Sequence, residues 1–578
     1  MIWDMSIEMN DNFEKLKVHA DARWEALVNG NKPWIRIGSA LCGEAAGSKQ
    51  VFQKIKEYLE HKGIEAIISK VGCMGMCFAE PMLDITAPGM PRTIYGSINP
   101  DTVSQIVDQH LIKEKPIDNL VLGILGDDES STLPSLMHHP MMKDQVRIAL
   151  RNVGNVDPAE INDYIANDGY KALHKALTSM SSQEVLDEVS NSGLKGRGGA
   201  AFSTGTKWSF LANSDAPIKY ILVNCEEGDP GAFNDKGILE SDPHSLLEGT
   251  ILAGYATGAT MGYVFVRQGH SGPIDRIWNA IYQAREMGIL GKNIFNSSFD
   301  FDVEVSLTGD SYVAGEETAL MESMEGKRAM PRYRPPFPAQ VGLFGKPSNI
   351  NNVKTLSYVP QIILNGSDWF ANIGTDGSKG TAIICLSGDL VYTGMIEVPL
   401  GTSLEKVIYD TSGGVPGGGE VKLLQTGGPL GGVLSGKALD ISLDFESMAK
   451  AGAILGSGGI IAASNSVCVV NLTRNIIAFC QYESCGKCFP CRTGMSHLLE
   501  ILERICKFKG KDDDLDLLSK VGNNMQAGSL CGHGQLGFNP VSSAFRYFPE
   551  EFDQHIRDKT CVTGDCYETW YTPARTRR

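Results

Sequence analysis

Hydrophobic and polar positions follow different periods in successive parts of the 578-residue chain. A polar, helical pattern covers 1–30. The next stretch predicts a helix over 48–61 and short strands at 35–38, 65–69, 84–86 and 92–95. Further along, apolar strands alternate with helices, the strands at 219–224, 262–267 and 300–306 and the helices at 246–257 and 275–287. Strands with Gly-rich turns return over 380–440, and the pattern is helical from Phe445. This order predicts a multidomain α/β protein.

The length of the chain predicts three or four domains, each large enough for its own core. The β/α rhythm of the first stretch is typical of a thioredoxin-like fold, and the later alternation of strands and helices of a Rossmann-like fold. The predicted division is an N-terminal extension at 1–30, a thioredoxin-like domain at 31–112, a linker or extended arm at 113–143, a Rossmann-like α/β domain at 144–374, a β-grasp module at 375–442, a helical bundle at 443–550 and a C-terminal tail at 551–578.

Composition narrows the class of protein. A net charge of −16 argues against nucleic-acid binding, which normally needs a basic surface. No apolar run is long enough to cross a bilayer, and the first residues lack the pattern of a signal peptide, so we expect a cytoplasmic protein. In that compartment the 14 cysteines indicate metal or iron–sulfur ligands before disulfides.

The segment 193–208 (GLKGRGGAAFSTGTKW) holds five glycines, with Lys195, Arg197 and Lys207 between them. Glycines let several backbone N–H groups approach one anion, and the cations add the charge that a phosphate needs. A dinucleotide fingerprint would follow a buried strand, whereas 183–192 has the pattern of an amphipathic helix. The sequence therefore favours an unusual nucleotide or flavin loop over a Rossmann fingerprint; a mobile surface loop is the simpler alternative.

Two acidic stretches follow at positions where α/β folds place ligands. Glu226, Glu227 and Asp229 come directly after the strand at 219–224, where they suit ribityl or ribose hydroxyls; a solvated acidic turn is the alternative. Glu316 and Glu317 open a helix, whose N-terminal N–H groups suit an anion or a flavin ring edge. A proline-rich loop then carries the amides Asn349, Asn351 and Asn352.

Cysteine spacing predicts an iron–sulfur cluster in the helical part. Cys485, Cys488 and Cys491 form C-x2-C-x2-C, which lets three thiolates face one cubane, and Cys531 supplies a remote fourth ligand. Zinc is the alternative, although zinc sites more usually pair their cysteines as C-x2-C. We therefore predict a [4Fe–4S] cluster.

Two other cysteine groups are less complete. His555, Cys561 and Cys566, with Cys468 or Cys480, form a possible zinc site; two free thiols in the tail are the alternative. Cys42, Cys73 and Cys77 resemble the ligands of thioredoxin-like [2Fe–2S] ferredoxins, but such a cluster needs four, and Ile37 stands near the expected fourth position. Ser39 or Glu44 are possible substitutes, and a docking domain without a cluster is the alternative.

From about Asp144 to Tyr567 the chain resembles the FMN- and NADH-binding subunit of respiratory complex I and the beta subunits of NAD-linked hydrogenases and formate dehydrogenases. The resemblance implies that FMN is wrapped by Gly196, Arg197, Gly198, Gly199 and Lys207. It implies a turn that holds the ribityl chain and ring, made by Asn224, Glu226 and Glu227. It places the nicotinamide over the segment with Tyr312, Gly315, Glu316 and Glu317, the two glutamates as positioning groups of the catalytic site. It sets Asn351 and Asn352 near the flavin phosphate, and the adenine end among Phe202, Phe210, Arg334 and Phe337.

The chain departs from the family pattern in GAAFSTG, TGDSYVAGEE and RQGHSG. The predicted function is an NADH-oxidising or NAD-reducing flavoprotein subunit that passes electrons through FMN to a [4Fe–4S] cluster. The alternative is a scaffold subunit that binds both groups but has lost or changed its hydride donor. The resemblance also implies partners, namely a thioredoxin-like [2Fe–2S] subunit and a low-potential catalytic subunit such as a hydrogenase or formate dehydrogenase.

Overall fold

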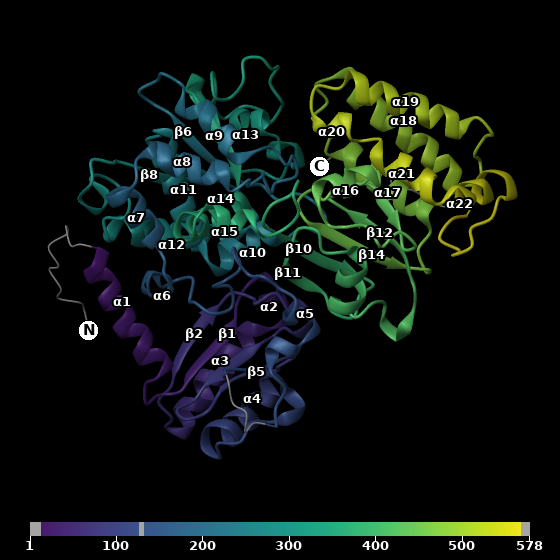
Figure 1. Cartoon of the computed structure of the whole chain (residues 1–578). Helices are drawn as coiled ribbons and strands as arrows, with labels where there is room; N and C mark the ends of the chain where they lie inside the picture. The colour runs from purple at the N-terminus through teal and green to yellow at the C-terminus, as the bar shows by residue number, and fades with distance from the viewer. Residues whose placement is uncertain (1–12, 127–131, 568–578) are drawn as a thin grey trace.

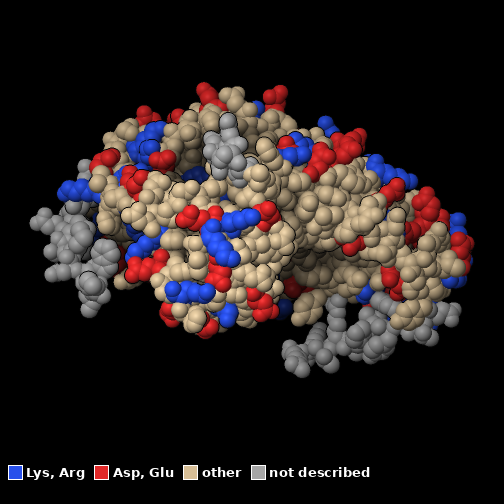
Figure 2. All heavy atoms as spheres, turned by 90° about the horizontal axis from the view of Figure 1, so that it is seen from below, with Lys and Arg blue, Asp and Glu red and all other residues tan. Residues whose placement is uncertain are grey.

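The computed structural model describes residues 13–126 and 132–567. Figure 1 shows a purple N-terminal domain below, a teal α/β domain at the upper left, and a green sheet with a yellow helical bundle at the right. Three sheets organise these parts. Seen from below, acidic and basic side chains are interspersed over the surface, without a broad basic face (Figure 2).

The first sheet has the order β2-β1-β3-β4-β5. Its strands are β1 Trp34–Gly38, β2 Ile67–Val71, β3 Leu83–Thr86, β4 Arg92–Tyr95 and β5 Val121–Leu125. Only β1 and β2 run parallel, joined through the helices α2 Leu41–Ala46 and α3 Ser48–Lys62. The thioredoxin-like fold is confirmed. The expected linker at 113–143 contributes β5, which pairs with β4, so the sheet continues beyond residue 112.

The second sheet, β8-β7-β6-β9, is parallel throughout. Its strands are β6 Tyr220–Cys225, β7 Met261–Arg267, β8 Asp302–Thr308 and β9 Ser348–Asn352. The first three match the predicted strands to within two residues. The fourth differs from prediction, because the amides expected on a rigid loop form a strand paired with β6. Strand pairing there outweighs the low β-propensity of asparagine.

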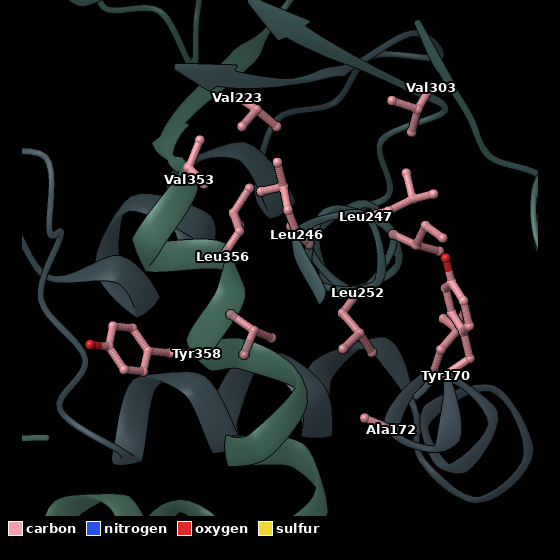
Figure 3. Packing of buried hydrophobic residues seen from close by; sticks show 14 of the residues in the cluster. Tyr170, Ala172, Val223, Leu246, Leu247, Leu252, Val303, Val353, Leu356 and Tyr358 are labelled. Atoms are coloured by element: carbon pink, nitrogen blue, oxygen red, sulfur yellow. The ribbon is translucent and has the colours of Figure 1, made fainter. Parts of the chain in front are cut away.

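Helix α11, Pro243–Thr257, forms the centre of this domain, and 14 of its 15 residues are buried. Such a helix is apolar on nearly all sides and needs neighbours all round. Figure 3 shows Leu246 of α11 beside Leu356 of α14, Val353–Asn365, and below Val223 of β6, while Leu247 points toward Val303 of β8. Other helices that cover the sheet are α7 Lys171–Ser179, α8 Ser182–Asn191, α9 Thr204–Ala212, α10 Asn234–Ser241, α12 Ser271–Glu286 and α13 Glu317–Met324. Helix α8 confirms the helical pattern before the Gly-rich loop.

The third sheet has the order β11-β10-β14-β12-β13. Its strands are β10 Thr381–Gly388, β11 Gly394–Pro399, β12 Val421–Thr426, β13 Val433–Ser435 and β14 Gly459–Ser464. Strand β14 lies inside the stretch assigned to the bundle, yet it occupies the middle of this sheet, parallel to β10. The third sheet therefore includes residues beyond 443, where the sequence predicted the bundle to begin.

The bundle that follows contains α17 Val469–Tyr482, α18 Phe489–Cys506, α19 Asp514–Gly528, α20 Gly532–Gln535, α21 Asn539–Tyr547 and α22 Pro549–Asp553. Its core joins Leu498 and Leu502 of α18 with Leu518 of α19 and Val541 of α21. No helix among the described residues is long and apolar enough to span a membrane. At the other end of the chain, α1, Phe13–Val28, packs on the α/β domain, where Phe13 stacks on His174 with ring centroids 4.8 Å apart.

Candidate functional site

The carboxyl ends of β6 and β9 form the edge of the parallel sheet where a ligand is expected, and this region is called the crevice below. Strand β6 comes first in sequence, yet β7 pairs on one side of it and β9 on the other. The chain therefore changes direction between β6 and β9, and ligands of open α/β sheets bind at such a switch point. Asn224 and Asn352 are partners in this register and both stand at the crevice.

The Gly-rich loop crosses this crevice. Gly196 N–H donates to the carbonyl of Phe202 at 2.8 Å, which closes the loop on itself. A Cβ on Gly198 would lie 2.9 Å from the Cβ of Asn352, so only glycine allows the loop to pass over β9. Gly199 has φ +121°, a conformation that other residues rarely adopt. The loop therefore has the close backbone approach and the conformational freedom that a flavin cradle needs.

Arg197 lies differently from the prediction that it wraps the cofactor. Its side chain is 4% exposed, and the guanidinium donates to the carbonyls of Lys195, Thr381 and Lys379 at 2.8, 3.1 and 2.6 Å. It also packs over the rings of Tyr358 and Phe445. The sequence indicates a cation in the loop. It does not indicate that the guanidinium forms hydrogen bonds with backbone carbonyls. Arg197 holds the loop on β10 of the third sheet, and its side chain is not a free phosphate donor in the crevice.

A network of amides orders the strand below the loop. Trp208 Nε1 donates to Asn351 Oδ1 at 3.1 Å, and Asn351 Nδ2 donates to Asn349 Oδ1 at 2.8 Å. Asn349 Nδ2 in turn donates to the carbonyl of Lys207 at 2.6 Å. The network fixes helix α9, which carries Lys207, against β9.

Asn352 belongs to a second network that sequence reasoning missed. Its Nδ2 donates to Asp235 at 2.6 Å, and its Oδ1 caps α14 by accepting from Lys354 N–H. Lys354 Nζ donates to Asp235 and Asn234 at 2.9 and 2.7 Å, with its side chain buried. Burial alone would lower the pKa of Lys354, but the carboxylates of Asp235 and Glu227 raise it.

The acidic turn after β6 is held by backbone and by one arginine. Glu226 pairs with Arg267 at 2.5 Å and accepts from Gly228 N–H, while Glu227 accepts from Asp235 and Lys236 N–H at 2.7 and 2.8 Å. Burial raises the pKa of both glutamates to about 7. Asn224 Nδ2 donates to the carbonyl of Gly315 at 2.8 Å, so the turn is joined to the next predicted segment.

The two glutamates at the start of α13 differ in role. Glu316 is the N-cap and accepts from the N–H groups of Thr318 and Ala319, both at 2.9 Å. Glu317 pairs with Lys207 at 3.2 Å and with Arg334, and these cations lower its pKa although burial alone would raise it. Glu317 therefore connects three segments, namely α9 after the Gly-rich loop, α13 and the proline-rich loop. Glu316, in contrast, caps its own helix.

Three aromatic residues expected near the adenine end are exposed. Phe202 and Phe210 are 50% and 53% exposed, and their ring centroids lie 6.4 Å apart. Phe337 is 54% exposed on the proline-rich loop, where its N–H donates to Gln340. The two rings of the Gly-rich segment thus form one apolar surface, and Phe337 stands on the loop that Arg334 ties to Glu317.

Cys485, Cys488, Cys491 and Cys531 line one small cavity, together with Val313, Pro331 and His533. A single tetrahedral zinc ion would draw its ligand sulfurs to about 3.8 Å from one another. The described residues hold two groups of ligand atoms that all lie within 4.8 Å of one another, and these four sulfurs form neither of them. Sulfurs spread around a cavity suit a cubane cluster and not one ion.

Tyr312 connects the crevice to this cavity. Its hydroxyl donates to Asp229 at 2.8 Å, while its ring contacts Phe479 and His533 with centroids 5.5 and 5.6 Å away. Burial raises the pKa of Tyr312 well above its usual value, so the hydroxyl keeps its proton. Val313, the next residue, lines the cysteine cavity. The two predicted cofactor sites therefore share the turn that precedes α13.

The C-terminal ligand group is also brought together. The ligand atoms of Cys468, His555, Cys561 and Cys566 all lie within 4.8 Å of one another. His555 Nε2 lies 3.4 Å from the sulfur of Cys468, and its Nδ1 lies 2.7 Å from the Glu551 carbonyl. Cys480, the alternative fourth ligand, lies outside this group. With Nδ1–H donated to the carbonyl, Nε2 is left as a metal ligand, the arrangement typical of zinc-binding histidines.

The N-terminal cysteines converge as well, in a group of three. Cys42, Cys73 and Cys77 have sulfurs within 4.8 Å of one another, and those of Cys73 and Cys77 are 3.8 Å apart. Neither predicted substitute for a fourth ligand joins them, because Ser39 donates to the carbonyl of Val71 and Glu44 pairs with Lys49. The buried carboxyl of Glu80 lies beside them, and burial raises its pKa to about 7, with the charge of Cys42 adding to the shift.

The fold and the two centres define a flavin-binding, iron–sulfur oxidoreductase component. Residues 189–361 match the Nuo51 FMN-binding domain, and 471–555 match the NADH-ubiquinone oxidoreductase-F iron–sulfur binding region. The chain belongs to the NADH-quinone oxidoreductase-F family, which the sequence resemblance predicted. FMN, NAD(H) and a [4Fe–4S] cluster as its cofactors are likewise confirmed.

Individual relatives agree with this assignment. The NADP-reducing hydrogenase subunit HndC of Solidesulfovibrio fructosivorans is 48% identical over 424 residues, which cover 73% of this chain and 86% of that protein. The NADH-quinone oxidoreductase F 2 protein of Rhizobium meliloti (strain 1021) is 41% identical over 72% of this chain and 98% of that protein. A crystal structure of NAD⁺-reducing [NiFe]-hydrogenase in the H₂-reduced state shares the fold, with a TM-score of 0.64 and 24% identity over 94% of this chain and 88% of that chain.

Proposed function

We propose that the crevice at β6 and β9 binds FMN and receives a nicotinamide dinucleotide over it, and that electrons leave through the bundle cluster. The observation that carries this proposal is the turn 312–317. In this turn Tyr312 donates a hydrogen bond to Asp229 of the acidic turn, Val313 lines the cysteine cavity, and Glu317 forms an ion pair with Lys207. One short segment therefore fixes the positions of both centres relative to each other.

FMN held by the Gly-rich loop would supply the chemistry that links a two-electron hydride donor to a one-electron iron–sulfur cluster. The task of this chain is to bind and orient. We expect Gly198 and Gly199 to let the loop approach the flavin, and Asn351 and Asn352 to lie near its phosphate. Glu317 holds Lys207 and Arg334 at the mouth, where the cations face the dinucleotide. No side chain is required to take up a proton from the dinucleotide.

The altered turn RQGHSG still supports this site. Arg267, its first residue, pairs with Glu226, so the departure from the family pattern keeps the acidic turn in place. This argues against the alternative of a scaffold that has lost its hydride donor.

Exposed aromatic side chains surround the cysteine cavity and support a docking surface for an electron-accepting partner. Tyr482, Phe489 and Tyr333 are 71%, 67% and 70% exposed, and Lys487, which lines the cavity, lies 5.2 Å from the ring of Tyr333. A partner that covers this surface would bring its own centre near the cluster. Such partners would be a thioredoxin-like [2Fe–2S] subunit and a low-potential catalytic subunit.

The proposal extends to the C-terminal ligands and the compartment. Cys468, His555, Cys561 and Cys566 bind one structural zinc ion, which ties α17 to the end of the chain. The 14 cysteines, all described, form no disulfide, which suits the reducing cytoplasm.

The test is anaerobic addition of NADH to the purified, iron-replete chain, followed by visible absorbance. Bleaching of the flavin band together with loss of the broad iron–sulfur absorbance is the expected result. A flavin that dithionite bleaches but neither NADH nor NADPH does would refute hydride transfer and favour the scaffold. Flavin bleaching without a change at the cluster, in a chain with four irons, would refute the electron path.

A further inference from the structure

Each basic side chain of the Gly-rich segment is already engaged with a protein group. Lys195 pairs with Glu446 at 2.9 Å, and Lys207 pairs with Glu317 at 3.2 Å. Arg197 donates to three backbone carbonyls. A phosphate group carries about two negative charges, which need compensating cations or oriented N–H donors. Part of the compensation for a flavin phosphate therefore has to come from outside the segment.

Lys354 is a buried cation at the expected phosphate end of the crevice. It follows Asn352 by two residues, its side chain is 2% exposed, and its ammonium donates to Asp235 and Asn234. It also lies in the first turn of α14, where a positive charge opposes the helix dipole. Burial and the dipole both disfavour the ammonium, and the carboxylates of Asp235 and Glu227 offset this by raising its pKa.

Asp235 links this cation to Asn352. One oxygen of its carboxylate, Oδ1, accepts from Lys354 at 2.9 Å, and the other, Oδ2, accepts from Asn352 Nδ2 at 2.6 Å. Because Oδ1 of Asn352 caps α14, the orientation of the amide is fixed. Its second Nδ2 hydrogen has no acceptor among the described residues and is left for a ligand. The ion pair therefore holds the amide in place and cancels the charge of the carboxylate directly behind it.

We propose that Lys354 makes the crevice select a phosphorylated flavin, by neutralising Asp235 behind Asn352. The inference rests on the proposed function, since it takes the crevice as the flavin site. Lys354 acts through its two neighbours and is a positioning residue. Without its charge, the buried carboxylate would repel the phosphate of FMN but not the uncharged end of riboflavin. At an effective dielectric constant of about 20, a unit charge about 12 Å from an anion still changes its binding about tenfold.

The experiment compares FMN with riboflavin on the full-length chain stripped of flavin, by quenching of flavin fluorescence. In Lys354→Met, the Kd for FMN is expected to rise about 10-fold or more, while the Kd for riboflavin stays within about threefold. Lys219→Met is the matched control. Lys219 is also a buried lysine of this domain, 7% exposed, but it precedes β6 at the opposite edge of the sheet. Both Kd values of this control should equal those of the unchanged chain.

Two further variants test the mechanism. Lys354→Gln removes the charge but keeps an amide donor for Asp235, so it should show the same selective loss of FMN binding should the methionine variant not fold. Lys354→Met combined with Asp235→Asn removes both charges, and the preference for FMN should return to within about threefold of the unchanged chain, because replacing a buried ion pair by uncharged groups is often neutral.

Three results would overturn the proposal. These are equal losses of FMN and riboflavin binding, an unchanged FMN preference in both single variants of Lys354, and a double variant that binds FMN as weakly as Lys354→Met. Gly198→Ala, whose Cβ would lie 2.9 Å from the Cβ of Asn352, separates this failure from that of the proposed function. Weaker FMN binding in Gly198→Ala alone would refute only the role of Lys354. FMN binding that neither change affects would show that the crevice is not the flavin site.

Discussion

Replacing Gly198 by alanine should weaken FMN binding through Asn352. The added Cβ would lie 2.9 Å from the Cβ and 3.3 Å from the Cγ of Asn352, whereas carbon atoms pack best at about 3.5–4.0 Å. Asn352 therefore has to move by about 0.6 Å or more, although it bonds to Asp235 at 2.6 Å and caps α14. Overpacking of this kind costs about 1–3 kcal/mol. If the cost falls on the bound state, the Kd for FMN rises about 5- to 150-fold.

Quenching of flavin fluorescence, titrated into chain stripped of FMN, measures this Kd. Gly196→Ala is the matched variant in the same loop, because its Cβ would meet only the backbone of Phe202, whose carbonyl oxygen lies at an ordinary 3.6 Å. We expect its Kd to stay within about threefold of the unchanged chain. Equal losses in both variants would show that any methyl in the loop disturbs the cofactor, and wild-type affinity in Gly198→Ala would show that Asn352 yields freely. Either result refutes the reasoning.

Three further predictions concern buried polar groups. Arg197→Lys should destabilise the Gly-rich loop by about 2–3 kcal/mol and raise FMN loss on dilution, because an ammonium group does not reproduce the three carbonyl contacts of the guanidinium; unchanged FMN retention would contradict this. Tyr312→Phe leaves Asp229 without its 2.8 Å donor and should lower stability by about 1–2 kcal/mol, while the visible spectrum of the cluster is kept. Burial raises the pKa of Asp242 from 3.8 to about 6, so the stability it contributes is present below pH 4 and lost as the pH rises through 6. Asp242→Asn should therefore be more stable than the unchanged chain by about 3 kcal/mol at pH 8 and lose that advantage at pH 4, as thermal unfolding at the two values would show.

The features that could be predicted most directly from the sequence are those in which neighbouring residues all meet the same physical requirement. Apolar runs over β6, β7 and β8 predict buried parallel strands, since both faces of such a sheet are covered by helices. Cysteine spacing likewise predicts the cluster, because three thiolates on one short turn have few other uses. These features depend on residues close together in the chain, and they were found.

Other features depend on contacts that spacing does not encode. Arg197 in a Gly-rich loop has the composition of a phosphate ligand, and only the carbonyls of Thr381 and Lys379, almost 200 residues away in sequence, show that it is engaged elsewhere. Strand β9 was missed because its pairing with β6 decides its conformation, not the propensity of its asparagines.

Helix α10 joins these observations. At its N-terminus, Asp235 and Lys236 donate to Glu227 in the flavin turn, and near its C-terminus Glu240 accepts from Leu41, beside Cys42. Eight residues at 1.5 Å each span about 12 Å, so the flavin crevice and the N-terminal cysteines are neighbours.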